Sequence, residues 1–472
     1  MTVLQKKATS PIAHLTPEDI DELGRRLDAI RAEIVASRGE RDAAYIRKVI
    51  DVQRKLELSS RAVLLFSLFP PAWLVGTAGL SVAKILENME IGHNVMHGQW
   101  DWMRDPKIHS TTWEWDNASP SEQWKHSHNE LHHTYTNVIG RDNDLGFGIM
   151  RVDEDQRWYP LYVVQPLWNL LNACVFEYGI AAYDLELGKN LASKKRRSSP
   201  EFKARGKQVL RKIRGQVTKD YIAHPALSGP SFLHTMAANA TANLVRNLWT
   251  HSVIMCGHFP EGVETFERRS IEGETRGEWY LRQMLGSANI SGGKAMHMMT
   301  GNLSYQIEHH LFPDLPSNRY QEIAPKVQAL FEQYGLTYTT GPLPVQVASA
   351  WSKVIRLSLP NGFLEETSRK LRRRTGRPGA ARGVDQRRAV RAGAGCLTTS
   401  GLCSAQVLDH VVDARREGLD VGRVDRREHP HPQLVAAELA IGLHVDDPVG
   451  SQDLRDRGGV DDVVEVDSAG HQ

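Results

Sequence analysis

The sequence predicts an all-α integral membrane protein, in which four transmembrane helices form two hairpins beneath a cytosolic helical cap. Three observations predict this fold: four apolar stretches, basic segments that flank them, and histidines that cluster near the ends of these stretches. The histidine clusters and both chain termini are expected on the cytosolic side of the cell (plasma) membrane, which the chain crosses several times.

Residues 1–58 are predicted to form a cytosolic, amphipathic helical lead-in. Thr16 is expected to cap the first helix, because Pro17 suits the first helical position and the acidic Glu18 and Asp19 suit the first turn. The rest of the segment carries many Arg and Lys residues, which favours a cytosolic location.

The first hairpin is predicted at the start of a membrane domain that covers residues 59–363. Residues 62–86 read AVLLFSLFPPAWLVGTAGLSVAKIL, and Lys84 is the charged residue among them. The pair Pro70-Pro71 stands near the middle of this run, and proline ends or kinks a helix. We therefore expect two membrane helices in opposite directions, the second of which continues to His93.

The second hairpin is predicted from the apolar stretches at about 159–182 and 232–257. Many Lys and Arg residues at 189–214 separate the two stretches. The positive-inside rule places this basic loop in the cytosol, together with the lead-in, so both hairpins enter and leave the membrane from that side. The alternative is a soluble all-α protein whose apolar helices are buried, which the negative mean hydropathy favours.

Residues 364–472 have a different composition from the rest of the chain. All 11 Phe, 11 Trp and 12 Tyr residues lie before residue 364. A segment without aromatic residues buries little large apolar surface, so we expect it to be disordered or poorly packed. Its residue types are those that GC-rich codons give when they are read out of frame, which suggests a frameshift between about 364 and 376. A genuine low-complexity tail is the alternative.

The composition excludes several classes of protein. The chain has 58 Lys and Arg against 56 Asp and Glu, a net charge of +2, which gives no reason to expect a nucleic-acid partner. The four cysteines form no C-x-x-C pair, so we expect neither a disulfide framework nor a thiolate metal site.

The spacing of the histidines is the strongest functional signal. His93 and His97 stand four residues apart, so on an α-helix their imidazoles share one face. His128, His132 and His133 span an arc of a second helix that is wide enough to serve two metals. His126 lies towards the side of His133, as a spare ligand or a supporting group.

A third cluster lies near the end of the membrane domain. Gln306, His309 and His310 fit within about 100° of one helix, which the following Leu-Phe-Pro should end. The fourth apolar stretch adds His258, the better metal candidate at its cytosolic end, and His251, for which a metal role and a packing role are equally favoured. Three residues of that stretch share the same face and are expected to bridge helices: Asn239, Asn243 and Asn247.

Imidazole clusters without thiolates favour iron, copper or zinc. A structural zinc needs four ligands, whereas these clusters offer at least eight nitrogens, so two metals are the simpler interpretation. Neutral imidazoles suit iron that changes its oxidation state, and such a centre with O2 cleaves unactivated alkyl C–H bonds, which no amino-acid acid or base does. We therefore expect two iron ions (Fe2+/Fe3+), with O2 as co-substrate.

The order H-x3-H, H-x3-H-H and Q-x2-H-H, around two membrane hairpins, resembles the membrane fatty-acyl desaturases. The segments EIGHNVMHGQWDW, HNELHHTYTN and GNLSYQIEHHLFPDLPSNRY are similar to the bacterial acyl-CoA desaturases, and the resemblance covers about residues 13–362. Gln306 stands where many members have His, and it is expected to reach iron directly or through water. The resemblance implies that two irons are bound by these residues: His93, His97, His128, His132, His133, His258, His309 and His310.

The resemblance also implies the reaction, the O2-dependent desaturation of a long-chain fatty acyl-CoA to give a cis double bond, with position 9 favoured. The Gln306 form is similar to front-end (position 6 or 5, linoleoyl-type) desaturases, which are one alternative. A fatty-acyl or alkane hydroxylase on the same diiron scaffold and a membrane metal transporter are others. The His-Pro-Gly-Gly haem motif of a fused cytochrome b5 domain does not occur. Electrons are therefore expected from a separate ferredoxin-type or NAD(P)H-dependent donor. The other expected partners are acyl-CoA and membrane lipid.

Overall fold

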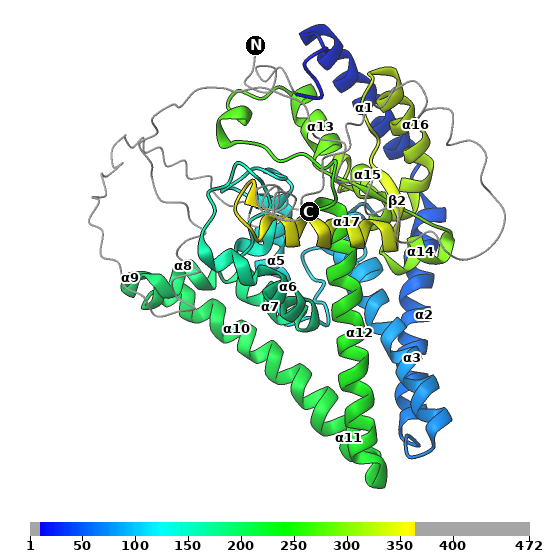
Figure 1. The fold of residues 1–472 in the computed structure, drawn as a ribbon. Coiled ribbons are helices and arrows are strands. Elements are labelled where there is room, and N and C mark those ends of the chain that lie inside the picture. Colours follow the sequence, from blue (N-terminus) through cyan, green and yellow to red (C-terminus); the bar gives the residue numbers. More distant parts are fainter. Residues whose placement is uncertain (1–9, 143, 364–472) are drawn as a thin grey trace, which may run out of the picture.

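The computed structural model describes residues 10–142 and 144–363, and within them it confirms the predicted all-α class. A narrow bundle of long helices stands below a broader cap of short helices (Figure 1). Two short strands, β1 (Asn289–Ser291) and β2 (Thr340–Pro342), pair in parallel within the cap, with Ile290 opposite Gly341. The predicted tail at 364–472 lies outside the described residues.

The lead-in forms α1 (Pro17–Ser37) and the first part of α2 (Glu40–Leu64). Thr16 caps α1 as predicted: its hydroxyl accepts a hydrogen bond from the backbone N–H of Asp19, whose carboxylate accepts one from the backbone N–H of Thr16. Helix α1 packs against α13 (Arg276–Leu285). Gly277 permits this close approach, because a Cβ there would lie 2.3 Å from the carbonyl oxygen of Ile20. The lead-in is therefore part of the cap.

Two hairpins form the bundle. Helices α2 and α3 (Pro70–Leu86) make the first, and the predicted proline pair begins α3. In the second, α10 (Pro200–Val217), η7 (Thr218–Ala223) and α11 (His224–Leu227) lead to a turn, after which α12 (Phe232–His258) returns. The hydroxyls of Ser67 and Thr235 lie 2.8 Å apart and join the tips of the two hairpins.

The second hairpin differs from the prediction. Residues 159–182, expected to pair with α12, divide into short helices, η6 (Pro160–Val164), α6 (Gln165–Cys174) and α7 (Phe176–Asp184). The partner of α12 in the hairpin is instead η7–α11. The hydropathy pattern did not identify η7–α11 as a bundle helix, because the segment contains the charged residue Asp220. In the structure, Asp220 is buried in ion pairs with Lys84 (2.8 Å) and Arg61 (2.9 Å).

The four transmembrane helices stay a prediction. Within residues 10–142 and 144–363, no helix is both long enough and apolar enough by mean hydropathy to cross a membrane. Arg246 of α12 also forms a buried ion pair with Glu177 of α7.

The largest apolar cluster of the cap receives Leu23, Tyr280 and Phe331 from α1, α13 and α16 (Tyr320–Gln333). Helices α15 (Gln306–Leu311) and α17 (Leu343–Leu357) also belong to the cap. The other elements are η2 (Glu87–His93), α4 (Asn94–Met96), η3 (Asp101–Met103), α5 (Ser121–Trp124), η4 (Lys125–His132), η5 (Leu145–Gly148), α8 (Leu187–Ala192), α9 (Lys194–Arg197), η8 (Gly229–Ser231), η9 (Arg268–Ile271), α14 (Lys294–Met299), η10 (Leu303–Tyr305) and η11 (Ser317–Arg319).

Candidate metal centre

Four segments bring the histidine clusters together where the bundle meets the cap. Helix α3 continues into η2, which ends at His93, and η4 carries His128 and His132. Helix α12 ends at His258, and α15 begins at Gln306, which confirms the predicted helix of the third cluster. Residues more than 200 positions apart in the sequence therefore meet at one site.

The helices of the first two clusters are not the regular α-helices that the sequence interpretation assumed. Both η2 and η4 are π-helices, and the backbone N–H of His133 donates to the carbonyl of His128, five residues earlier, at 3.1 Å. His97 keeps an α-helical bond to the carbonyl of His93, also 3.1 Å, so this pair shares a face as predicted. Single π-turns are rare and are frequent at functional sites.

The imidazoles form two groups, and within each group the ligand atoms lie within 4.8 Å of one another. The first group consists of His93, His97, His128 and His309. The second group consists of His132, His258 and His310. The structure thus brings seven of the eight predicted histidine ligands into two adjacent sites.

His133, the eighth predicted ligand, lies between the two groups. Its ring stacks on that of His310, with a centroid distance of 4.5 Å, and lies 4.7 Å from the ring of His97. Both of its ring nitrogens are buried without a hydrogen-bond partner among the described residues. His133 faces both groups, and its role as a ligand stays a prediction.

The hydrogen bonds of the histidines suit metal binding. Nδ1 of His93 lies 3.1 Å from Asn94 Oδ1, Nδ1 of His309 lies 3.2 Å from the hydroxyl of Tyr320, and Nδ1 of His310 lies 3.2 Å from Gln283 Oε1. A buried imidazole nitrogen without a partner is unfavourable unless it binds a metal, and metal-binding histidines use their other nitrogen in this way. The residues therefore fit two metal ions. Buried Nε2 atoms without a hydrogen-bond partner in the described chain belong to His93, His97, His128, His132 and His309.

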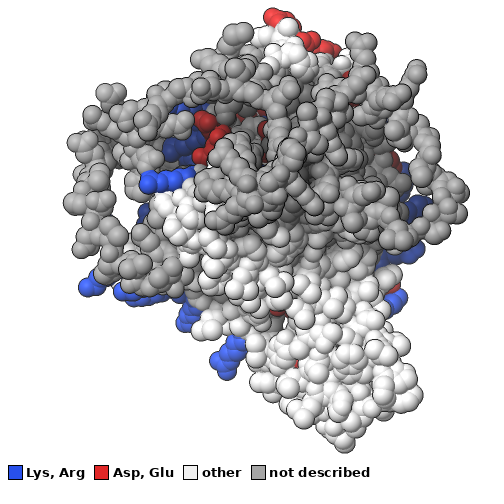
Figure 2. All heavy atoms as spheres, viewed as in Figure 1, with Lys and Arg blue, Asp and Glu red and all other residues white. Residues whose placement is uncertain are grey.

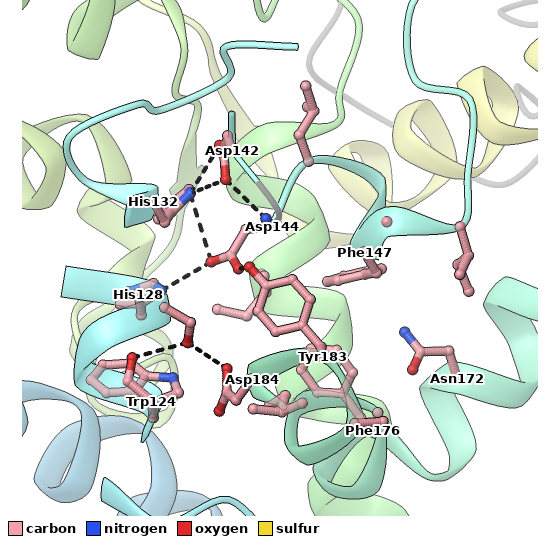
Figure 3. Close-up of a pocket in the computed structure, with 18 of the residues that line it drawn as sticks. Trp124, His128, His132, Asp142, Asp144, Phe147, Asn172, Phe176, Tyr183 and Asp184 are labelled. Atoms are coloured by element: carbon pink, nitrogen blue, oxygen red, sulfur yellow. Dashed lines mark hydrogen bonds and ion pairs between the residues drawn. The ribbon is translucent and has the colours of Figure 1, made fainter. Parts of the chain in front are cut away.

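Two aspartates support the histidines of η4. Both carboxylate oxygens of Asp142 lie 3.0 Å from Nδ1 of His132, and Asp144 Oδ2 lies 3.0 Å from Nδ1 of His128 (Figure 3). Burial alone would lower the pKa of His132, but the two carboxylates outweigh it and raise that pKa to about 9. Burial lowers the pKa of His128 well below its ordinary value, so this imidazole is neutral, as a metal ligand must be.

Gln306 adjoins the second group. Its Nε2 lies 3.0 Å from Nε2 of His258, which lies 3.1 Å from Nε2 of His310, while Gln306 Oε1 is buried without a partner among the described residues. Gly257 leaves room for this side chain, since a Cβ there would lie 2.9 Å from it. Gln306 therefore lies beside the second group, and its role as a ligand, direct or through water, stays a prediction.

The two remaining histidine candidates lie outside both groups. His126 is exposed and pairs with Glu130 at 2.6 Å. His251 is buried, but its Nε2 lies 2.9 Å from Asn169 Oδ1. The asparagines of α12 bridge helices as expected; for example, Asn247 donates to the carbonyl of Cys174 at 3.0 Å.

An apolar cavity of about 480 Å³ reaches both groups. Figure 3 shows Phe147 and Phe176 on its wall, with His128 and His132 on the side of the histidine groups. Gln306 also lines it. From there it extends to α8, where Lys189 and Leu191 contribute to the lining. A mostly apolar cavity that reaches both histidine groups fits an apolar ligand whose reacting atoms lie beside them.

A separate polar pocket of about 420 Å³ reaches the first group. His97 lines it, together with Asp101, Lys125 and Asn129. The metal centre is thus approached from two different surfaces, one apolar and one polar.

Sequence reasoning missed the residues that support the ligands. Asp142 and Asp144 follow η4 in a loop, Tyr183 belongs to α7, and Tyr320 begins α16. No helical spacing relates them to the histidines, because their contacts form only in the folded chain. The acidic pair Asp142 and Asp144, ten and twelve residues beyond His132, was the available signal.

Comparison with known proteins gives concordant matches. A family model described as "Fatty acid desaturase" matches residues 69–342. The NADPH-dependent stearoyl-CoA 9-desaturase of Mycobacterium tuberculosis (strain CDC 1551 / Oshkosh) is 50% identical over 360 residues, which cover 75% of this chain and 84% of that protein. The sn-1 linoleoyl-lipid 6-desaturase of Synechocystis sp. is 24% identical over 328 residues, 68% of this chain and 89% of that protein. No solved structure matches the chain.

Proposed function

The chain belongs to the fatty acid desaturase family, and we propose that it introduces a cis double bond at position 9 of a saturated long-chain acyl-CoA. As a member of this family it is an oxidoreductase of lipid metabolism. The observation that carries the proposal is the pair of histidine groups beside an apolar cavity. The 50% identity to a stearoyl-CoA 9-desaturase supports both the substrate and the bond position.

Two iron ions, one in each histidine group, are the proposed cofactors. When bound, iron supplies the redox chemistry with O2 that takes one hydrogen from each of two adjacent methylene groups. Over the whole reaction, O2 takes up these two hydrogens together with two electrons from the donor and two protons, and it is reduced to two waters. The chain itself holds the imidazoles through Asn94, Asp142, Asp144 and Tyr320, and buries them from solvent.

The apolar cavity is the proposed site of the acyl chain. Phe147, Phe176 and Ile180 offer apolar contacts along its wall, and Trp124 stacks on His128 with a centroid distance of 4.4 Å. Binding there would exclude water and place methylene groups beside the metals. Proximity of this kind lowers the entropic barrier to reaction.

A basic segment beside the cavity fits the CoA group. Helix α8 lines the cavity through Lys189, and α9 consists of four consecutive basic residues, Lys194–Arg197, all exposed. Figure 2 shows Lys and Arg gathered along this edge of the molecule. Arg and Lys are the usual partners of phosphate groups, so the CoA phosphates would bind here while the acyl chain enters the cavity.

Insertion of the bundle into the plasma membrane is part of the proposal, with the metal centre and termini in the cytosol. The end formed by α3, α11 and α12 shows almost no charged residues on the face in Figure 2. Its exposed apolar side chains include Phe66 (72% exposed) and Leu227 (78% exposed) at the two tips. Exposed apolar surface of this kind is unfavourable in water and favourable against lipid.

A separate oxidoreductase, of ferredoxin type or dependent on NAD(P)H, is the proposed electron donor. The name of the Mycobacterium tuberculosis relative includes NADPH dependence, which supports this source of electrons. The polar pocket is lined by His97, a proposed metal ligand, and is the proposed place at which the electron donor approaches the metal centre.

Product analysis tests the proposal. The full chain would be expressed in a host that lacks its own desaturase, and its fatty acids would be analysed for the presence and position of double bonds. We expect a cis-9 monounsaturated product from stearoyl chains. A hydroxylated product without an unsaturated one would show a hydroxylase, and an unchanged lipid profile with iron uptake would favour a transporter.

A front-end desaturase is the second candidate. Gln306 in the third cluster is the observation that favours it, together with 24% identity to the sn-1 linoleoyl-lipid 6-desaturase of Synechocystis sp.. The same host fed with linoleate separates the two candidates. A new bond at position 6 would support the front-end candidate and reject position 9.

A further inference from the structure

A chain of hydrogen bonds joins the wall of the apolar cavity to the metal centre (Figure 3). The hydroxyl of Tyr183 donates to Oδ1 of Asp144. Asp144 Oδ2 lies 3.0 Å from Nδ1 of His128 and 3.6 Å from Nδ1 of His132. Since His128 belongs to the first metal group and His132 to the second, Asp144 contacts one ligand of each.

Tyr183 stands on the part of the wall that an acyl chain would touch. Helix α7 begins after the break at Val175, and Phe176, Gly179, Ile180 and Tyr183 all line the cavity. The neighbouring residue, Asp184, is hydrogen-bonded by the hydroxyl of Ser127 in η4. Two successive residues of α7 are therefore tied to the segment that carries His128 and His132.

The hydroxyl of Tyr183 is a fixed donor. Burial and the adjacent Asp144 raise the pKa of Tyr183 well above its ordinary value, so the phenol keeps its proton near neutral pH. The carboxylate of Asp144 is partly buried, and it is held less firmly if it loses such a donor. Imidazole orientation in metal sites depends on partners of this kind.

We propose that Tyr183 is a positioning residue that couples occupation of the cavity to the orientation of His128 and His132. An acyl chain packed against α7 fixes Tyr183, which fixes Asp144 and the two imidazoles. By thermodynamic linkage, acyl-CoA then strengthens iron binding, and iron strengthens acyl-CoA binding by the same factor. This inference rests on the proposed function, because it takes the occupant of the cavity to be an acyl chain.

The test measures the affinity of the full-length chain for Fe2+ by anaerobic competition with a calibrated chelator. It is done with and without saturating stearoyl-CoA and in the absence of an electron donor, so that no turnover occurs. In the wild type, we expect stearoyl-CoA to raise the affinity for Fe2+ at least about fivefold. In Tyr183→Phe, both metal sites still fill, but stearoyl-CoA no longer changes their affinity.

Tyr178→Phe is the matched control. Tyr178 is on the same helix but packs against another apolar cluster, around Ala118 and Val209. Tyr178→Phe should keep the wild-type effect of stearoyl-CoA on the affinity for Fe2+.

Asp144→Asn is the second test variant. It keeps the shape of the side chain but weakens the connection between Tyr183 and the two histidines. Like Tyr183→Phe, it should lose the effect of stearoyl-CoA on the affinity for Fe2+.

Turnover gives an independent readout. With an electron donor present, Tyr183→Phe should consume more O2 per double bond than the wild type or Tyr178→Phe. A Tyr183→Phe protein that keeps the full effect of stearoyl-CoA on iron affinity overturns the proposal. So does one that cannot bind iron even without stearoyl-CoA, because Tyr183 would then support the site in general.

The design separates this inference from the proposed function. If stearoyl-CoA binds the wild type without changing its affinity for Fe2+, the coupling is wrong and the proposed substrate stands. If stearoyl-CoA does not bind at all, the proposed substrate fails and the coupling with it.

Discussion

The two histidine groups offer unequal sets of candidate metal ligands. The first has four imidazoles, from His93, His97, His128 and His309, whereas the second has three, beside which Gln306 places an amide. Both groups adjoin the apolar cavity, the first through His93 and His128 and the second through His132 and His258, but in the first group His97 also lines the polar pocket.

The support of the ligands differs less than the ligands themselves. The carboxylate of Asp142 holds His132 of the second group and that of Asp144 holds His128 of the first, whereas the neutral hydroxyl of Tyr320 holds His309. A carboxylate makes an imidazole more basic than a hydroxyl does, so one histidine in each group gains basicity from its support. The comparison teaches that the two groups differ in their candidate ligands while each has one carboxylate behind a histidine.

Removing one imidazole from each group gives the largest expected effect. His309 and His310 are adjacent on α15 but belong to different groups. We expect His309→Ala and His310→Ala each to lower desaturation below detection and to leave one iron per chain, measured by elemental analysis. His126→Ala, at an exposed position outside both groups, should behave as the wild type. Normal activity in either α15 variant would show that the assignment of ligands to groups is wrong.

Changing the amide tests the weaker side of the second group. Gln306→Ala should lower the affinity of one of the two sites for Fe2+ by roughly tenfold, whereas Gln306→His should retain it by supplying a fourth imidazole. Titration of the metal-free protein with Fe2+ measures both. Equal affinities for Fe2+ in the wild type and Gln306→Ala would show that Gln306 does not contribute to metal binding.

Asp142→Asn tests the charged support of the second group. It removes the charge that makes His132 basic, and changes of this type lower metal affinity or activity by about 10- to 100-fold. The loss should appear at one of the two sites in the Fe2+ titration. A loss spread equally over both sites would show that Asp142 does not act through the second group alone.

Tyr320→Phe gives the smallest expected effect on catalysis. The hydroxyl of Tyr320 lies 3.2 Å from Nδ1 of His309 and donates to the carbonyl of Phe312 at 3.0 Å. Its loss leaves the buried Nδ1 of His309 unpaired, whereas the carbonyl of Phe312 still accepts from the backbone N–H of Leu315. Unfolding free energy should fall by about 1–3 kcal/mol, measured by denaturant unfolding. Desaturation should fall less than in Asp142→Asn; a larger fall would mean that neutral support matters more than charged support.

The sequence was sufficient to predict the all-α class, the first hairpin and the histidines that meet at the site. Spacing identified them because each cluster occupies one helical segment, such as α15. The π-helical form of η2 and η4 was not predicted, since apolar periodicity does not specify which backbone carbonyl accepts each hydrogen bond.

Tertiary contacts account for what the sequence could not predict. The segment η7–α11 was not recognised as the partner of α12, because Asp220 looks incompatible with a buried helix until its ion pairs with Lys84 and Arg61 are known. Asp144 and Tyr183 were missed for the same reason, as a loop and a separate helix bring them to the histidines.

Iron content of the purified full-length chain tests the central claim most directly. The two groups of imidazoles predict two iron ions per chain after reconstitution with Fe2+, measured by elemental analysis against protein concentration. A saturating content of one iron ion per chain would contradict the account, because one of the two groups would then not be a metal site.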